Sequence, residues 1–219
     1  MTITYHGHSC FKLKGKSGTV VTDPYSDSVG FASPSLTADV VTVSHQHSDH
    51  NAVNRVKPAA GREKPFLIDA VGEYEVGGIS VFGNPSFHDV EAGANRGANN
   101  IFTIMLDGIR ACHLGDLGHE LTERQVEEIG LIDVLFVPVG GVYTLDPQQA
   151  IKTALALNPS FVVPMHYKTE AHNPDTYGSM KTLEDFANEY GVQINPVEKL
   201  VVEKDRLPEE MEVVILSHT

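Results

Sequence analysis

The most constraining feature of the sequence is a short stretch, residues 44–51, that holds several metal-binding side chains. Four of them lie within six residues in the pattern H-x-H-x-D-H: His45, His47, Asp49 and His50. The preceding residues, 39–43, are apolar and β-branched, which predicts a buried strand that ends just before these side chains. Imidazole and carboxylate groups suit zinc and related metals. One ion that keeps an open coordination position needs fewer protein ligands than the four in this stretch. The stretch therefore predicts two metal ions; the alternative is a polar loop with incidental histidines.

The composition is that of an ordinary globular protein with an acidic surface. Hydrophobic residues make up 41% and charged residues 21% of the 219 residues, so the chain can bury a sizeable core. We expect one domain over residues 1–219. The formal net charge of −13 opposes electrostatic binding to nucleic acid or anionic membranes. We therefore expect a small-molecule substrate as partner, no nucleic acid and no membrane, in a monomer or a homo-oligomer.

Three features predict a cytoplasmic protein. The first residues lack the basic and apolar regions of a signal peptide. No apolar run approaches the roughly 18 residues of a membrane-spanning helix. The cysteines Cys10 and Cys112 each lie in a strand-like segment, which favours two buried thiols in a reducing compartment over a disulfide framework.

Short strands predominate in the first half of the sequence, and helices alternate with strands in the second half. The expected strands are residues 3–5, 9–14, 19–22, 39–43, 65–68, 79–82, 101–106, 109–113, 131–137 and 160–164. The expected helices are residues 52–56, 122–130, 146–157 and 180–190, and residues 24–38 are expected to form a loop. Asp146, followed by Pro147 and Gln149, predicts a capping box for the third helix. Asp107 and Gly108 predict a tight hairpin. This order of elements predicts an α/β layered domain.

Three further metal-binding side chains follow later in the sequence. His88 lies in a loop, Asp116 comes soon after the expected strand 109–113, and His166 follows the expected strand 160–164. Together with the first stretch they make seven candidate ligands. Seven ligands are enough for two metal ions with an open bridging position.

The motif H-x-H-x-D-H, followed by His88, Asp116 and His166, resembles the pattern of the metallo-β-lactamase superfamily. The resemblance implies a four-layer αββα sandwich, in which two sheets lie between helices and the metals lie where the sheets meet. It also implies a division of the ligands. His45, His47 and His88 would hold one metal, Asp49, His50 and His166 the second, and Asp116 would bridge the two.

Four shorter segments are similar to one branch of this superfamily. They are residues 6–11, 113–116, 138–141 and 164–167, and the branch comprises metal-dependent hydrolases related to ascorbate-6-phosphate lactonase. The similarity implies a cytosolic hydrolase without fixing its substrate. A pair of metals lowers the pKa of a bridging water enough to supply hydroxide at neutral pH. We expect that hydroxide, oriented by Asp49 as the catalytic residue, to attack a small ester, lactone or phosphoester. Zinc is the favoured metal, with manganese or iron as alternatives.

Other side chains have candidate roles around such a centre. Asp23 is either a support for a metal-bound histidine or a plain turn residue. His113, three residues before Asp116, is expected to support the site from behind its ligands. The candidate substrate contacts are His8, Tyr143 and Lys168, each with an alternative as a packed or surface residue. Arg96 and Asn100 are expected to border the cleft. His119, His172 and His218 are expected to be exposed to solvent, whereas His6 is undecided.

Three other functions are less consistent with the sequence. RNA-processing relatives have an extra domain between the positions of Asp116 and His166, but only 49 residues lie between them here. Di-iron relatives that reduce oxygen carry glutamate where His47 stands, together with an added flavin domain. A non-catalytic metal-binding scaffold would be expected to have lost ligands. A metal-dependent hydrolase is therefore the favoured function.

Overall fold

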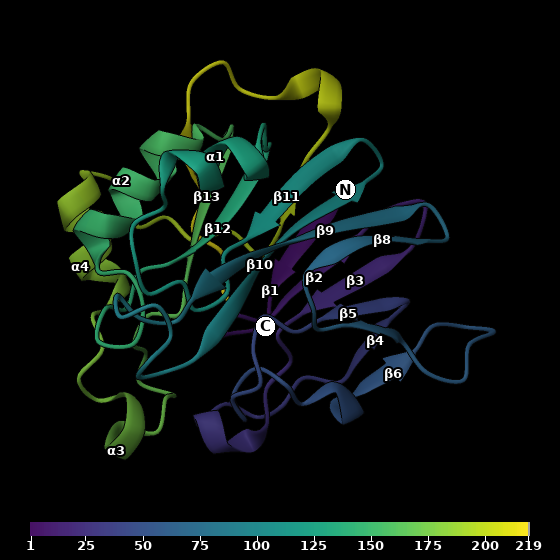
Figure 1. The fold of residues 1–219 in the computed structure, drawn as a ribbon, viewed down its shortest axis with the longest axis horizontal. Helices are drawn as coiled ribbons and strands as arrows, with labels where there is room; N and C mark the ends of the chain where they lie inside the picture. Colours follow the sequence, from purple (N-terminus) through teal and green to yellow (C-terminus); the bar gives the residue numbers. More distant parts are fainter. Residues whose placement is uncertain (219) are drawn as a thin grey trace.

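Two β-sheets packed face to face form the centre of the molecule in a computed structural model that describes residues 1–218 (Figure 1). The first sheet has six strands, in the order β14 (Leu200–Val201), β1 (Thr2–Tyr5), β2 (Phe11–Lys14), β3 (Thr19–Thr22), β5 (Val40–Thr42) and β7 (Phe66–Ile68). The second has seven, in the order β15 (Glu212–Val213), β13 (Phe161–Met165), β12 (Val134–Pro138), β11 (Ile109–His113), β10 (Ala98–Leu106), β9 (Ile79–Phe87) and β8 (Gly72–Val76). A small sheet pairs β4 (Leu36–Ala38) with β6 (Val56–Pro58).

Strand direction determines where the side chains of the site gather. In the first sheet β3, β5 and β7 run parallel, and in the second sheet β11, β12 and β13 run parallel. The carboxyl ends of parallel neighbours meet at one edge of a sheet, so residues that follow different strands become neighbours. The turn between β10 and β11 has positive φ at Asp107 and Gly108, and the predicted hairpin is confirmed.

The core between the sheets follows from the alternation of side chains along the strands. Val20 and Val40 belong to the cluster that faces the second sheet, whereas Val21 and Val41 belong to a cluster on the outer face. Across the inner space the rings of Phe11 on β2 and Phe136 on β12 lie 4.2 Å apart between centroids. Residues from both sheets therefore share one hydrophobic core.

Helices cover the outer face of the second sheet (Figure 1). They are α1 (Glu123–Ile129), α2 (Pro147–Leu157) and α4 (Leu183–Tyr190), and the one-turn helix α3 (Pro174–Tyr177) lies apart from them. Each of the three longer helices begins with a capping box, in which a side-chain oxygen accepts the third backbone N–H of the helix. The capping box predicted for Asp146 and Gln149 is confirmed.

The cover on the outer face of the first sheet contains little α-helix. It consists of the 3-10 turns Asp27–Val29 and Val53–Arg55, the small sheet and α3, which bury Tyr25, Val29 and Tyr177 against Val21 and Val41. A further 3-10 turn, Lys204–Arg206, lies near the C-terminal end. The predicted α/β class and four-layer αββα arrangement are confirmed, although one outer layer is built mainly from turns and loops.

Several predicted boundaries were wrong. Residues 53–55 form only a 3-10 turn, because Val56–Pro58 extends to pair with Leu36–Ala38 and Pro58 cannot continue a helix. The same pairing places a strand inside the predicted loop 24–38. The helix expected at 180–190 begins at Leu183, where Thr182 caps it. The strand Gly72–Val76 was not predicted; its side chains are mostly exposed and give little hydrophobic pattern.

Two expectations concern burial and membranes. Cys10 and Cys112 are both buried and free, as predicted. Within residues 1–218, none of the helices has the length and apolar character needed to cross a bilayer.

Candidate metal centre

The first ligand stretch is attached to the sheet through Asp23 and Ser44. Asp23 follows β3 and Ser44 lies two residues after β5, so the parallel pairing of these strands brings the two residues together. The Ser44 amide donates to Asp23 Oδ1 at 2.8 Å, and the Ser44 hydroxyl donates to Oδ2 at 2.5 Å. Asp23 Oδ2 also accepts from His50 Nδ1 at 2.9 Å. One fully buried carboxylate therefore fixes both ends of the stretch that carries His45 and His50.

The second sheet supplies the remaining candidate ligands from three strand ends. His88 directly follows β9, His166 directly follows β13, and Asp116 lies three residues after β11. The Asp116 amide donates to Asn99 Oδ1 at 2.9 Å. His166 has a positive φ of 52°, a strained conformation for a residue other than glycine.

Gly115 allows Asp116 to turn into the site. Its φ is +58°, and a Cβ there would lie 2.3 Å from Asn99 Oδ1 and 2.5 Å from Ser44 Cβ.

We expect Gly115→Ala to lower the free energy of unfolding of the metal-free protein by about 2–4 kcal/mol in urea titrations, because backbone strain and overpacking add. The matched control is Gly191→Ala, where φ is +83° but no atom lies within 4 Å of the added Cβ. Equal losses in the two variants would exclude close packing as the cause.

The side chains of six of the seven candidate ligands converge in two groups. Ligand atoms of His45, His47 and His88 lie within 4.8 Å of one another, and so do those of His8, Asp49, His50 and His166. Sequence reasoning expected the second group without His8.

Asp116 lies between the two groups. Its Oδ2 is 3.2 Å from His88 Nε2 and 3.9 Å from His45 Nε2, both in the first group. The same oxygen is 3.3 Å from His50 Nε2 and 3.2 Å from His166 Nε2, both in the second group. A carboxylate in this position can contact cations on either side.

Unpaired buried polar atoms show that these residues fit metal ions. His45 Nε2, His50 Nε2, His88 Nδ1, both ring nitrogens of His166 and Asp116 Oδ1 are buried without a hydrogen-bond partner among residues 1–218. Leaving such an atom unpaired costs about 1–3 kcal/mol. A divalent cation would satisfy imidazole and carboxylate ligands of this kind.

The protonation states of Asp116, Asp49 and His45 also favour cations. Burial opposes the ionisation of Asp116, but His166 and His50 outweigh it and hold the pKa of that carboxyl well below its usual range. Burial likewise opposes ionisation of Asp49, and His50 outweighs it and lowers the Asp49 pKa. Burial lowers the pKa of His45 to about 3, so its ring is neutral at pH 7. Ionised carboxylates and a neutral imidazole are the states that bind metal.

His113 supports the turn to Asp116 from behind. Its ring is fully buried, and Nε2 donates to the Ser9 carbonyl at 2.9 Å. Its Nδ1 accepts the Gly115 amide at 3.2 Å. His113 thereby fixes the backbone just before Asp116.

A cavity of about 290 Å³ adjoins the two groups. It is lined by His47, Ser48, Asp49, His88, Arg96, Asp116, Tyr143, His166, Thr176 and Tyr177. The Tyr143 hydroxyl donates to the Thr176 carbonyl at 2.7 Å, so this side chain is held in the wall. The Tyr177 hydroxyl donates to Asp49 Oδ2 at 3.0 Å.

Arg96 is the one lysine or arginine in this wall. Its guanidinium carbon lies 4.7 Å from the centre of the Tyr143 ring, and Nη2 donates to the Val142 carbonyl at 3.3 Å. The Asp89 carboxylate accepts four backbone N–H groups of the loop, including that of Arg96 at 2.7 Å. The ion pairs that arginines form within residues 1–218 involve Arg55, Arg62, Arg124 and Arg206, not Arg96. The guanidinium therefore has charge and N–H groups available for a ligand.

Some residues singled out in the sequence lie elsewhere. Lys168 Nζ donates to the Gly178 carbonyl at 2.6 Å and is not in the cavity wall. His8 is fully buried and is not in the wall either. Asn100 donates to the Asp69 carbonyl at 3.2 Å. The expectation that His172 is exposed was wrong: it is 4% exposed, because the loop after β13 folds it against His8.

His119 and His218 do not line the wall; His119 is half-buried, not exposed as expected, whereas His218 is exposed. His6 is half-buried, with its Nε2 3.2 Å from Thr4 Oγ1. Sequence reasoning missed Ser48, Thr176 and Tyr177 as wall residues. The only local signal was Asn173-Pro174, which is typical of a helix start and precedes Tyr177.

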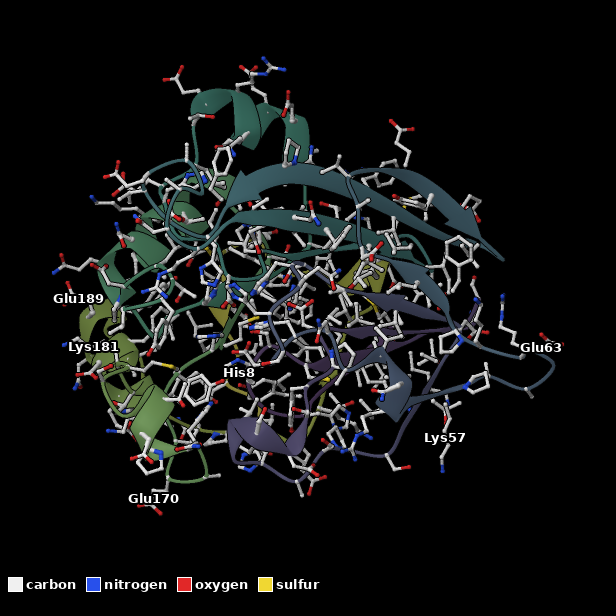
Figure 2. All side chains as sticks on the ribbon, turned by 60° about the horizontal axis from the view of Figure 1, so that its bottom comes forward. His8, Lys57, Glu63, Glu170, Lys181 and Glu189 are labelled. Carbon is white, nitrogen blue, oxygen red and sulfur yellow. The ribbon has the colours of Figure 1, made fainter. Side chains whose placement is uncertain are left out.

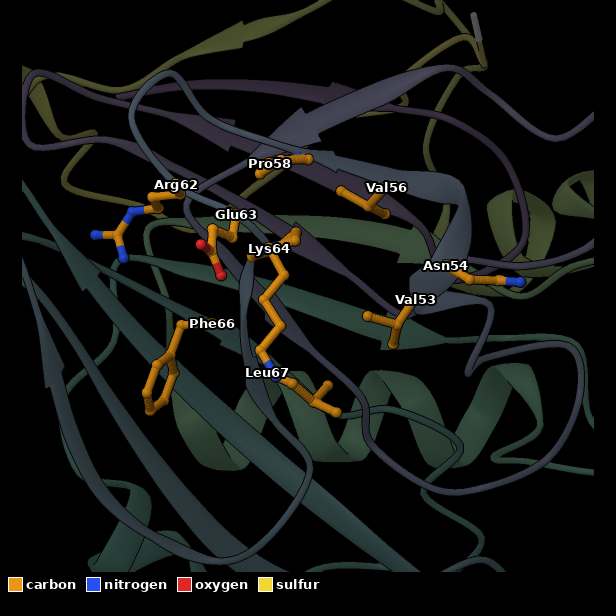
Figure 3. Close-up of a pocket in the computed structure, with 10 residues that line it drawn as sticks. Val53, Asn54, Val56, Pro58, Arg62, Glu63, Lys64, Phe66 and Leu67 are labelled. Atoms are coloured by element: carbon orange, nitrogen blue, oxygen red, sulfur yellow. The ribbon is translucent and has the colours of Figure 1, made fainter.

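A larger cavity, of about 640 Å³, lies beside the turn of residues 59–65 (Figure 3). Val53, Val56 and Leu67 lie toward one side of it, and Arg62 and Phe66 toward the other (Figure 3). None of its lining residues belongs to the two ligand groups. Its size does not make it the reaction site, because neither histidine nor aspartate is among its lining residues.

The profile of a family described as "Beta-lactamase superfamily domain" matches residues 2–166, most of the chain. The chain belongs to the metallo-β-lactamase superfamily. A UPF0173 metal-dependent hydrolase from Methanoregula boonei is 32% identical over 189 residues, covering 77% of this chain and 83% of that protein. Another from Methanoculleus marisnigri is 31% identical over 189 residues, covering 77% of this chain and 82% of that protein.

A solved structure from Thermotoga maritima is similar over nearly the whole length. It is described as a candidate Zn-dependent hydrolase of the metallo-β-lactamase superfamily, with 40% identity and a TM-score of 0.78. The match covers 98% of this chain and 97% of that one. The superfamily inferred from the ligand pattern is confirmed, and so is the enzyme class: the protein is a metal-dependent hydrolase.

Proposed function

We propose that the protein hydrolyses a small anionic ester, lactone or phosphoester with two divalent metal ions, and that zinc is the favoured metal. The observation that carries this proposal is the position of Asp116 Oδ2, within 3.9 Å of ring nitrogens from both ligand groups. His45, His47 and His88 would hold one ion, and Asp49, His50 and His166 the other. Two such ions would lower the pKa of bound water and stabilise negative charge that develops on the substrate.

The chain's own residues then orient the reactants. Asp49 is 20% exposed in its side chain and lies in the cavity wall, so its carboxylate can accept a hydrogen bond from attacking water and orient it. The Tyr177 hydroxyl that donates to Asp49 also lines this wall. Together they would hold water on the side of the cavity where the substrate enters.

Size and charge support a small anionic substrate. A cavity of about 290 Å³ admits a small molecule, and Arg96 has N–H groups available at its wall. Guanidinium groups bind carboxylate and phosphate through paired hydrogen bonds. The net charge of −13 opposes nucleic acid as a substrate, so we propose neither a nucleic-acid nor a membrane partner. We also propose a cytoplasmic location, as a monomer or homo-oligomer.

Replacing Arg96 by Ala should raise KM for an anionic substrate about 10–100-fold, since a charge-assisted hydrogen bond contributes about 1.5–3 kcal/mol. The kcat should change little, because Arg96 binds the anionic end and not the reacting atoms. Steady-state kinetics on a charged substrate and its uncharged analogue would measure this. Arg55→Ala is the control, since Arg55 pairs with Asp27 away from the wall. Equal losses on both substrates would contradict anion recognition.

The decisive experiment for the function is elemental analysis of the purified protein, followed by activity assays. We expect about two metal ions per chain, with His47→Ala and His166→Ala each losing about one. Protein treated with chelator and reloaded with zinc, manganese or ferrous iron would then be screened against esters, lactones and phosphoesters. Protein that fails to bind metal after reloading would overturn the proposal and leave a non-catalytic scaffold.

A further inference from the structure

His8 is the one member of the second ligand group whose ring nitrogens both have hydrogen-bond partners. Its side chain lies in the interior, in contrast to the labelled charged residues at the periphery (Figure 2). Its Nε2 is 3.2 Å from Asp49 Oδ2, and its Nδ1 is 3.3 Å from His172 Nε2. The candidate ligands His45, His50 and His166 instead have buried ring nitrogens without partners. His8 thus differs from a metal ligand in the way its nitrogens are used.

Thr169, His172, His8 and Asp49 form a row of hydrogen bonds. The directions of these hydrogen bonds follow from the Thr169 end of the row. The Thr169 backbone amide, which can only donate, lies 3.1 Å from His172 Nδ1. That nitrogen therefore accepts, and the His172 proton is on Nε2. His172 Nε2 donates to His8 Nδ1, so the His8 proton is on Nε2 and points to Asp49. If both His8 nitrogens carried protons, both His172 nitrogens would have to accept, and His172 would have no ring proton. The doubly protonated form of His8 is therefore excluded.

The backbone of His8 is fixed as firmly as its ring. Its φ of +54° is strained for histidine, and its carbonyl accepts the His166 amide at 2.8 Å and the Tyr5 hydroxyl at 2.9 Å. Such over-determination of a strained residue is typical of a functional position. The hydrogen bond from the His166 amide to the His8 carbonyl therefore fixes the two backbones relative to each other.

We propose that His8 and His172 are positioning residues, which hold the Asp49 carboxylate through a one-way row of hydrogen bonds from the Thr169 amide. Tyr177 supplies a second donor to the same oxygen, Asp49 Oδ2. Two donors on one oxygen restrict rotation of a carboxylate that is partly exposed at the cavity. Where activity is the readout, this inference rests on the proposed function.

The row extends beyond the part of the chain that matches the family profile. That match ends at residue 166, whereas Thr169, His172 and Tyr177 follow it. The segment is attached to the first sheet's cover, since the Asn173 amide donates to the Val29 carbonyl at 2.9 Å. The loop after β13 thereby contributes to the orientation of Asp49.

Two substitutions at His8 separate the two ends of the row. In His8→Gln the amide nitrogen occupies the place of Nε2 and can still donate to Asp49. In His8→Asn the shorter side chain reaches only His172, and asparagine tolerates the left-handed backbone well. We expect His8→Asn to keep about two metals per chain and to lose about 10–100-fold in kcat with little change in KM. His8→Gln should recover most of that loss.

The outcomes are distinguishable. Loss of one metal ion in both variants would make His8 a ligand and overturn the inference, as would full activity in His8→Asn. Long-range ¹H–¹⁵N NMR of the histidine rings in the unaltered protein gives a readout independent of activity. We expect the Nε2-protonated tautomer for both His8 and His172; an Nδ1-protonated ring at either would overturn the inference. If the unaltered protein hydrolyses nothing, the proposed function fails while the tautomers still decide this one.

Discussion

Replacing Asp116 by Asn is expected to remove most of the bound metal and to lower kcat/KM by about 10³-fold or more. The physical reason is its place between the ligand groups, with Oδ2 3.2 Å from both His88 Nε2 and His166 Nε2. The amide keeps the shape of the side chain but loses the negative charge that would bind two cations. Elemental analysis after dialysis and steady-state kinetics on the same preparation would measure both effects.

The control for this substitution is Asp205→Asn, which removes the same charge from an exposed position. It should retain the metals and the activity of the unaltered protein. If Asp116→Asn retained about two metals per chain and activity within about tenfold, Asp116 would not be a shared ligand. Metal loss without loss of activity would contradict the metal-dependent chemistry itself.

Replacing Asp23 by Ala is expected to have the largest effect on stability. Its fully buried carboxylate accepts from the Ser44 amide, the Ser44 hydroxyl and His50 Nδ1. Removal leaves these buried donors unpaired, which should lower the free energy of unfolding by about 3–5 kcal/mol. Urea titration of the metal-free protein at pH 7 would measure it. Asp23→Asn should lose less, since its amide oxygen can still accept from the Ser44 amide.

The pH dependence gives a second readout for Asp23. Burial raises its pKa, but the hydrogen bond from His50 and the nearby His113 outweigh burial and lower it. The folded pKa thus lies below the unfolded value of about 3.9, so the stabilisation is present above about pH 4 and is lost as pH falls through the folded pKa. The difference between the unaltered protein and Asp23→Ala should shrink below about pH 4.

Asp27→Ala is the matched control for Asp23→Ala. Asp27 also accepts a backbone amide, that of Ser33 at 2.8 Å, but its side chain is 62% exposed. Water can replace the carboxylate there, so the loss of stability should be small. Similar losses at Asp23 and Asp27 would mean that burial of the three donors has little effect.

Sequence reasoning was most successful where the signal is local. The stretch of His45, His47, Asp49 and His50 is one turn after one strand, so its composition alone indicates metal binding. The capping box of Asp146 and Gln149 and the hairpin at Asp107 are also decided within a few residues. In such cases backbone geometry follows from neighbouring side chains, and no distant contact is needed.

Predictions that depended on distant contacts were less accurate. Lys168 is two residues from His166, yet its ammonium reaches the Gly178 carbonyl because the chain turns back toward Thr182. His172 was expected to be a surface residue but is buried against His8, 164 positions earlier. The short strand Val56–Pro58 forms because Leu36–Ala38 offers a partner, which no pattern in residues 52–56 reveals.

The sequence by itself determined the superfamily, the α/β layers and the candidate ligands, because periodicity and short motifs encode strands, turns and donors locally. Tertiary structure alone decided which groups surround those ligands. Tyr177 lies 128 positions from the Asp49 carboxylate that it holds, and Arg96 lies 46 positions from Val142, whose carbonyl it binds. Contacts of that range depend on the packing of two sheets and on the course of the loops at their edge, and neither has a period in the sequence.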